Sequence, residues 1–235
     1  MREIPGRRRR LRFRHKGTPA QLDAALTCAT AWHWPVLPGV GLGPVARDDR
    51  GRGCACPDPE CVVPGAHPFD PGILAATTDA RMVRWWWTNR PTAPIVLATG
   101  GRAPCAVSLP AVAGARALAA LDRMGMRLGP VVATPTRWSL LVAPYSMEQL
   151  GELLYAKDWV PSSLRFHGEG GYLVLPPSEA GTGQVRWERA PLPGSASPWL
   201  PGVEAVVDAL VEASVSAPAE GFTPPEAGDG TRLTY

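Results

Sequence analysis

The chain has 235 residues and a formal net charge of +3, enough for one ordinary domain with terminal extensions or for two small domains. Glycine and proline make up about a fifth of the residues, which favours long connections around a folded body. No apolar run of about 20 residues is present, which argues against a membrane-spanning helix, and we expect a cytoplasmic protein.

The positive charge is concentrated at the start of the chain. Residues 1–16 hold eight of the 24 Lys and Arg residues and one acid, which leaves 16 basic and 20 acidic residues elsewhere. The body is therefore not a basic nucleic-acid clamp. We expect residues 1–19 to form a disordered arm that binds DNA or RNA phosphates without reading sequence, or else a solvated tail without a partner. The arginines expected to bind are Arg7, Arg8, Arg9, Arg10, Arg12 and Arg14.

The first half of the chain predicts two helices and three strands. Apolar residues recur at helical spacing over 21–34, and Pro35 follows. A short strand is expected within 34–41, and a second helix from Thr78 to the residue before Pro91. Three consecutive tryptophans occupy 85–87 of this helix, and because successive helical residues point about 100° apart, at least one must face outward. Residues 94–101 and 104–110 predict two neighbouring buried strands.

The second half alternates helices and strands without a strict parallel pattern. A helix ending at Gly125 is followed by a hairpin over 131–144. Ser146 and Gln149 have the spacing of a capping box that opens another helix. Two strands joined by a glycine-rich turn are expected within 163–178, a last strand at 185–190, and a short helix at 203–213. We expect an α+β body over 20–192 and a Pro/Gly-rich tail over 193–235.

A proline- and glycine-rich loop carries four candidate metal ligands. Cys54, Cys56, Cys61 and His67 are spaced C-x-C-x4-C-x5-H, compact enough to surround one ion. Tetrahedral zinc prefers thiolate and imidazole, and four protein ligands leave no open position, so we expect a structural zinc ion. Its binding energy would fix a loop with little secondary structure. The alternative is a group of free cysteines beside an incidental histidine.

Five segments follow one another in a characteristic order. They are WHWPVLPG at 32–39, the cysteine loop at 54–68, ATTDARMVRWWWTNRPTAPIVLATG at 76–100, VVATPTRW at 131–138 and GEGGYLVLPPS at 168–178. Together they resemble the N-terminal domain of bifunctional DNA primase/polymerases, the prim-pol group of archaeo-eukaryotic primases, in forms common in actinobacteria and mobile elements. The resemblance implies an RRM-like/prim-pol mixed sheet with flanking helices, in which carboxylates on adjacent strands hold two divalent metal ions for nucleotidyl transfer.

This chain lacks the carboxylates that the resemblance implies. Ser108 and Pro110 stand at the first two acidic positions and Arg165 at the third. Ser139 or Leu140 stands where the family has a phosphate-binding histidine. None of the replacements binds Mg²⁺ as a carboxylate does, so we expect no magnesium at this site.

Three functional readings remain open at this point, one of them a decaying remnant of a mobile element with no function. We favour a catalytically inactive domain that binds nucleic acid or protein as an accessory or regulatory protein, in DNA replication or of mobile-element origin. The remains of its nucleotide pocket would be Thr99, Gly100, Arg137 and His167. The alternative is an active DNA primase/polymerase whose metal ligands have been rearranged, for which the candidate acids are Asp79, Glu169 and Glu188.

Overall fold

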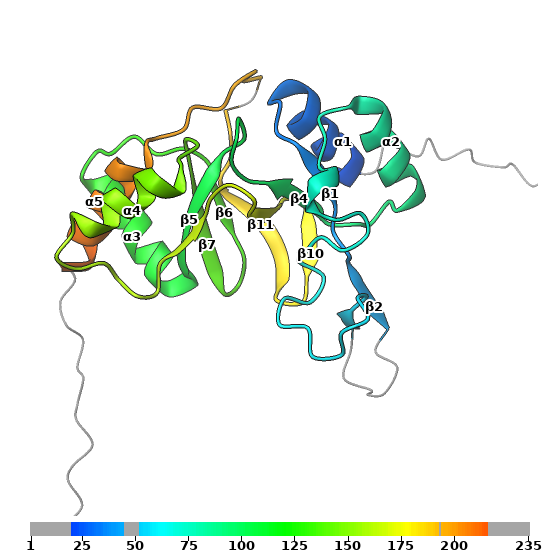
Figure 1. Cartoon of the computed structure of the whole chain (residues 1–235), viewed down its shortest axis with the longest axis horizontal. Coiled ribbons are helices and arrows are strands. Elements are labelled where there is room, and N and C mark those ends of the chain that lie inside the picture. The colour runs from blue at the N-terminus through cyan, green and yellow to red at the C-terminus, as the bar shows by residue number, and fades with distance from the viewer. Residues whose placement is uncertain (1–19, 45–51, 193, 216–235) are drawn as a thin grey trace, which may run out of the picture.

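The computed structural model describes residues 20–44, 52–192 and 194–215 (Figure 1). Its helices are α1 (Ala20–Leu26, continued by a π-helical turn, Thr27–Ala31), α2 (Ala80–Asn89), α3 (Ala111–Arg123), α4 (Met147–Tyr155) and α5 (Val203–Val215), with a 3-10 turn at Ile73–Ala75. Helices and antiparallel sheets are combined in the described residues, which confirms the α+β class. None of these helices is both long and apolar enough to cross a membrane.

The strands form three sheets. The largest has the order β10 (Ser178–Ala180), β11 (Gly183–Arg189), β6 (Val131–Ala133), β7 (Arg137–Val142), β5 (Cys105–Pro110), β8 (Arg165–His167). A second has the order β1 (Val36–Pro38), β4 (Ile95–Ala98), β9 (Tyr172–Leu175). The third is a two-stranded ribbon of β2 (Leu42–Pro44) and β3 (Arg52–Cys54).

The large sheet contains the topology of an RNA-recognition motif. Its elements follow the chain order β5-α3-β6-β7-α4-β8, and the four strands lie in the order β6-β7-β5-β8, which is the split β-α-β arrangement. All strand pairings in the described residues are antiparallel, so the mixed sheet expected above is in fact antiparallel. The reason is that strands running in the same direction are not neighbours. Strands β5 and β6 are separated by β7, and strands β7 and β8 are separated by β5.

The large sheet has a different core on each face. Helices α3, α4 and α5 lie on one side of it, and α1, α2 and the three-stranded sheet on the other (Figure 1). Successive side chains of β5 alternate between these faces. Val107 and Leu109 belong to the core with the helices α3–α5, whereas Ala106 packs in the core that contains β1, β4 and β9. Residues on the Ala106 face are therefore enclosed between two sheets.

Two expected strand neighbours belong to different sheets. The sequence predicts that the strands at 94–101 and 104–110 lie side by side, but β4 pairs with β1 and β9, whereas β5 pairs with β7 and β8. The strands expected within 163–178 are also present as β8 and β9, and the turn between them carries the chain from one sheet to the other. Short strand β10 has no counterpart among the predicted elements.

The predicted helix ends are largely confirmed. Asp79 is the N-cap of α2 and its carboxylate accepts hydrogen bonds from the N–H groups of Arg81 and Met82, so this helix begins two residues after the predicted start. Ser146 caps α4 by accepting from the N–H of Gln149. The Gln149 side chain donates from Nε2 to Glu204 of α5. Gly125 follows α3 with φ of 70°.

Side-chain burial shows how the three consecutive tryptophans and the last helix pack. Trp86 and Trp87 are buried and Trp85 is 62% exposed, which confirms that one of the three tryptophans faces outward. Trp87 also donates its indole N–H to the carbonyl of Ala93. Helix α5, within the segment expected as a tail, packs into the core with α3 through Val206, Val207 and Leu210.

Candidate functional site

The four expected metal ligands converge at one point. Cys54 ends β3 and the others follow in the loop, and the ligand atoms of all four residues lie within 4.8 Å of one another. Cys54 Sγ is 3.2 Å and Cys61 Sγ 3.4 Å from His67 Nε2. The other ring nitrogen, Nδ1, lies 2.9 Å from the carbonyl oxygen of Pro68, to which it donates. Nε2 is therefore the nitrogen available to a metal. Three thiols and this imidazole fit a tetrahedral ion such as zinc.

Local hydrogen bonds prepare one of the thiols for metal binding. Burial raises the pKa of Cys54, but hydrogen bonds, chiefly from the N–H of Gly65, outweigh it and lower the pKa to about 6. Cys54 is therefore a thiolate at neutral pH, the form that binds metals. Burial and the neighbouring Cys54 instead raise the pKa of Cys61 to about 11. Binding of an ion at this cluster must therefore release a proton from Cys61.

The segment between Cys61 and His67, which we call the metal loop, also forms a wall of a cavity. The carbonyl of Pro64 accepts a hydrogen bond from the N–H of Gly181, 2.7 Å away. Four residues of the loop line a cavity of about 520 Å³. They are Val62, Val63, Pro64 and Ala66. The metal cluster and the cavity therefore share one stretch of chain.

Two of the three positions that the family resemblance assigns to metal ligands, Ser108 and Arg165, line this cavity, and Pro110 does not. Ser108 on β5 pairs with Arg165 on β8 and with Ser139 on β7. Pro110, two residues along β5, pairs with Arg137 at the start of β7. Arg165, Ser108 and Ser139 therefore lie in one row across three adjacent strands, and Pro110 lies outside this row. No residue lining the cavity is Asp or Glu, so the donors here do not fit a pair of Mg²⁺ ions.

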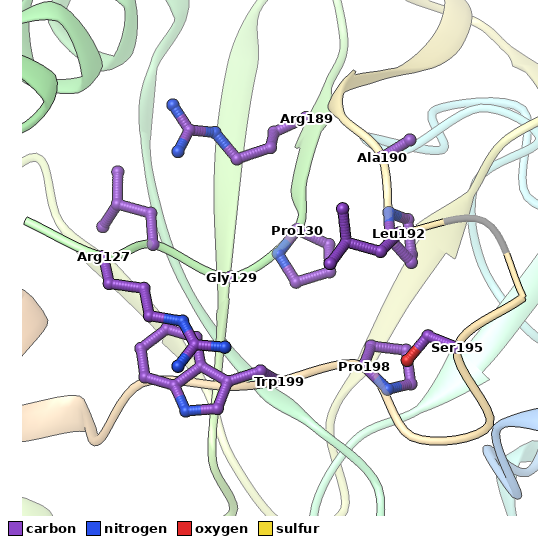
Figure 2. Close-up of a pocket in the computed structure, with 11 residues that line it drawn as sticks. Arg127, Gly129, Pro130, Arg189, Ala190, Leu192, Ser195, Pro198 and Trp199 are labelled. Atoms are coloured by element: carbon purple, nitrogen blue, oxygen red, sulfur yellow. The ribbon is translucent and has the colours of Figure 1, made fainter.

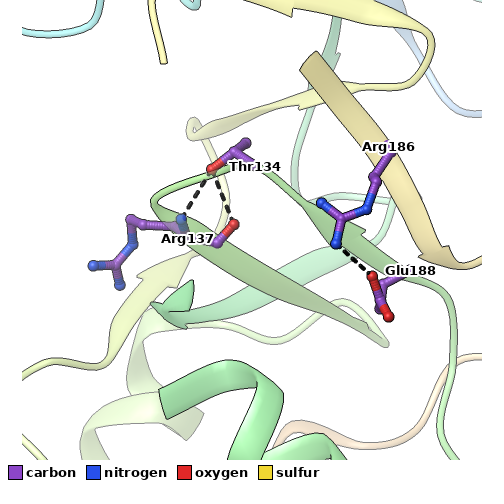
Figure 3. A network of polar contacts seen from close by, with 4 residues as sticks. All are labelled: Thr134, Arg137, Arg186 and Glu188. Carbon is purple, nitrogen blue, oxygen red and sulfur yellow. Dashed lines mark hydrogen bonds and ion pairs between the residues drawn. The ribbon is translucent and has the colours of Figure 1, made fainter. Parts of the chain in front are cut away.

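Ser108 is the centre of a hydrogen-bond network on this floor. Arg137 Nε and Nη2 lie 3.3 and 3.2 Å from Ser108 Oγ, and Nη2 also donates to the carbonyls of Ser108 and Ser163. Thr134 fixes the backbone of Arg137 by accepting from its N–H and donating to its carbonyl, and the guanidinium extends away from this turn (Figure 3). The position of the guanidinium is therefore set from both ends of the side chain.

His167 completes the network. Its Nδ1 donates to the carbonyl of Tyr172, 3.1 Å away, so Nε2 accepts the hydroxyl hydrogen of Ser108 at 3.1 Å. Burial lowers the pKa of His167, and the charges of Arg137 and Arg165 lower it further. The ring is therefore neutral at pH 7. In a nucleophilic serine triad a carboxylate accepts the hydrogen bond from the histidine Nδ1. Here the acceptor is the backbone carbonyl of Tyr172, and Ser108 is only 1% exposed, so the arrangement does not favour such a triad.

Other residues singled out from the sequence lie elsewhere. Thr99 and Gly100 do not line the cavity, because the turn at 168–171 covers them: Thr99 Oγ1 donates to the carbonyl of Gly168, and a Cβ on Gly100 would come within 2.4 Å of Glu169 Cα. The arginines of the arm lie outside the described residues.

The three alternative carboxylates do not gather into a site. Asp79 caps α2. Glu188 pairs with Arg186 on the same strand (Figure 3). Glu169 is exposed in the glycine-rich turn, and none of the three lines the cavity.

Sequence reasoning missed a smaller pocket of about 230 Å³ beside β11. The guanidinium of Arg127 stacks over the ring of Trp199, 4.1 Å from its centroid (Figure 2). Arg189 lines the same pocket and pairs with Asp122 at 2.6 Å. No motif in the sequence marks this pocket, because residues 127–130 and 189–199 meet only in the fold.

Comparison with known proteins supports one family. The sequence model of the family described as "Bifunctional DNA primase/polymerase, N-terminal" matches residues 25–201. This range includes the metal cluster and every strand of the large sheet. Neither a curated protein nor a solved structure matches the chain.

Proposed function

Because the chain belongs to the family of bifunctional DNA primase/polymerase N-terminal domains, we propose that it is a primase/polymerase-like protein that binds nucleic acid without extending it. The observation that carries the proposal is the row Arg165–Ser108–Ser139 on the cavity floor. Two-metal nucleotidyl transfer needs oxygen ligands that hold two cations about 4 Å apart. Guanidinium and hydroxyl groups at these positions repel the cations or bind them weakly.

The cysteine cluster supports a structural role for zinc. Four protein ligands close the coordination sphere of a tetrahedral ion, so no position is left for an activated water. We propose that zinc fixes the metal loop and, with it, one wall of the cavity. Reduced thiols at this cluster suit a cytoplasmic protein.

Nucleic acid is the partner that the charges and exposed aromatics favour. Trp85 is exposed on α2 and lies with Arg81 around a shallow pocket, a combination that stacks unpaired bases. We propose that the arginines of residues 1–19 add sequence-independent attraction to phosphates. The role is then that of an accessory protein in replication, and a protein partner on the Trp85 surface is the second candidate.

A primer-extension and de novo synthesis assay tests this proposal. We expect no incorporation of nucleotides with either Mg²⁺ or Mn²⁺, under conditions in which an active DNA polymerase extends the same template. Robust incorporation would show an active enzyme with rearranged ligands. In that case the variants Asp79→Asn, Glu169→Gln and Glu188→Gln would identify which carboxylate had taken over.

A further inference from the structure

The cavity between the two sheets holds an uncompensated positive charge. Arg137 and Arg165 both line it, on strands that flank β5 on either side. Burial lowers the pKa of Arg137, and the nearby charge of Arg165 lowers it as well. No carboxylate lines the cavity, and Arg165 makes no ion pair within the described part of the chain. Two like charges in a half-buried site are relieved by an anion.

The two guanidinium groups are available to a ligand in different ways. Arg137 uses Nε and Nη2 for Ser108 and Ser163, and its Nη1 has no protein partner in the described residues. Arg165 is exposed at the cavity edge. One guanidinium held by hydrogen bonds and one exposed guanidinium suit a phosphate group, which accepts paired N–H hydrogen bonds from arginine.

The rest of the cavity has room for more than a phosphate. Its volume of about 520 Å³ lies within the range of small-molecule sites. Val132 on the floor and Leu173 and Val174 of β9 line it, and these apolar side chains offer a surface to a base or sugar. The ligand chemistry that fits is therefore a phosphate joined to a less polar group.

We propose that Arg137 and Arg165 take the place of the divalent cations in this cavity, so that it binds the phosphate of a nucleotide without a metal ion. The inference rests on the proposed function, because it assumes that the site no longer polymerises. In place of metal ions bridging carboxylates and phosphates, the protein supplies the positive charge itself. The phosphate belongs either to a free nucleotide or to the end of a strand.

Titration calorimetry with the full chain and dATP tests the inference. The buffer contains no divalent cation and also no chelator, so that the cysteine cluster keeps its metal. We expect dATP to bind under these conditions, and added Mg²⁺ to leave the affinity unchanged or to weaken it, because Mg²⁺ neutralises the triphosphate. Binding that requires Mg²⁺, or no binding by the folded protein, overturns the inference.

Two variants separate the cavity from the rest of the basic surface. Arg165→Gln is expected to lower the affinity for dATP at least about tenfold, the loss typical of a charge-assisted hydrogen bond. Arg186→Gln removes an arginine that pairs with Glu188 on β11 and should keep the affinity. Both variants retain residues 1–19, so any attraction of dATP to these residues contributes equally to the two affinities. Equal affinities of the two variants, with circular dichroism showing both folded, contradict the proposal.

Two further binding measurements identify the source of the phosphate. If a 5′-phosphorylated oligonucleotide binds through Arg165 and its unphosphorylated form does not, the ligand is a strand end; if only dATP binds in this way, it is a free nucleotide. Either result supports the site. Primer extension stays a separate readout: extension with Mg²⁺ refutes the proposed function, whereas absent extension together with absent metal-free binding refutes only this inference.

Discussion

Ser108 and His167 share a partly buried hydrogen bond, with Oγ and Nε2 3.1 Å apart, that exists only while the imidazole is neutral. The reason is that His167 already donates from Nδ1 to the carbonyl of Tyr172. A proton on Nε2 would meet a serine that already accepts from Arg137, itself a cation. Protonation of His167 therefore opposes the folded state of this site.

The first prediction concerns pH. The folded-state pKa of His167 lies below its ordinary value of 6.5, so the unfolded chain takes up this proton first as the pH falls. The contribution of His167 is complete above pH 6.5 and is lost as the pH falls from there toward the folded pKa. Urea unfolding at several values between pH 8 and pH 5 should show a smaller acid-dependent loss in His167→Gln than in the parent. Identical pH profiles of the two proteins would refute this.

The second prediction concerns the metal. Purified protein prepared without chelator should contain about one zinc ion per chain, measured by elemental analysis, because four ligands meet at a single point. Cys61→Ser should lose the ion and melt several degrees lower, roughly 5 °C or more, which is about 2 kcal/mol for a chain of this size. Cys105→Ala, at a buried cysteine outside the cluster, should keep it. Metal-free parent protein would disprove the site.

The third prediction separates two adjacent tryptophans. Trp87 is fully buried and donates to Ala93, while Trp85 is exposed. Trp87→Ala should reduce the free energy of unfolding by about 3–5 kcal/mol, whereas Trp85→Ala should change it by less than about 0.5 kcal/mol. Guanidinium denaturation measures both. If Trp85→Ala also weakens binding of single-stranded DNA, the exposed indole stacks on bases; a large loss of stability in that variant would contradict its surface position.

The fourth prediction concerns residues 1–19. If their arginines bind phosphates, affinity for DNA of any sequence should fall steeply with salt, by about 0.9 log units per tenfold salt increase for each phosphate neutralised. Removal of residues 1–16 should flatten this dependence and weaken binding, measured by fluorescence anisotropy between 50 and 200 mM salt. Unchanged binding by the truncated protein would reject the assignment, and Arg186→Gln in the full chain is a control for loss of one surface charge.

Much of this protein could be predicted from local sequence, because the relevant signals act over short ranges. Asp79, Ser146 and Gly125 mark helix ends through their own backbone contacts, and the metal ligands lie within 14 consecutive positions. What could not be predicted is sheet membership. Nothing local distinguishes the apolar run of β4 from that of β5, since the sheet that each joins depends on partners far away, such as β9 and β7.

The cavity was only partly predictable for the same reason. Family resemblance led to Ser108, Pro110 and Arg165, and it led to Arg137 and His167 as remains of a nucleotide pocket. Strand register brings these residues together. Thr99 and Gly100 belong to a turn that is covered by another turn about 70 residues away, a contact that no spacing rule indicates.

If the cluster holds zinc as we propose, the metal loop also makes the cavity sensitive to oxidants. A disulfide between Cys54 and Cys61 would remove two of the four ligands in one reversible step, and the thiolate character of Cys54 makes it the more reactive of the two. Since Val62, Val63 and Pro64 follow Cys61 directly and line the cavity, release of the ion would free that wall. If the cavity binds phosphate as we propose, we expect this binding to depend on the reducing state of the surroundings.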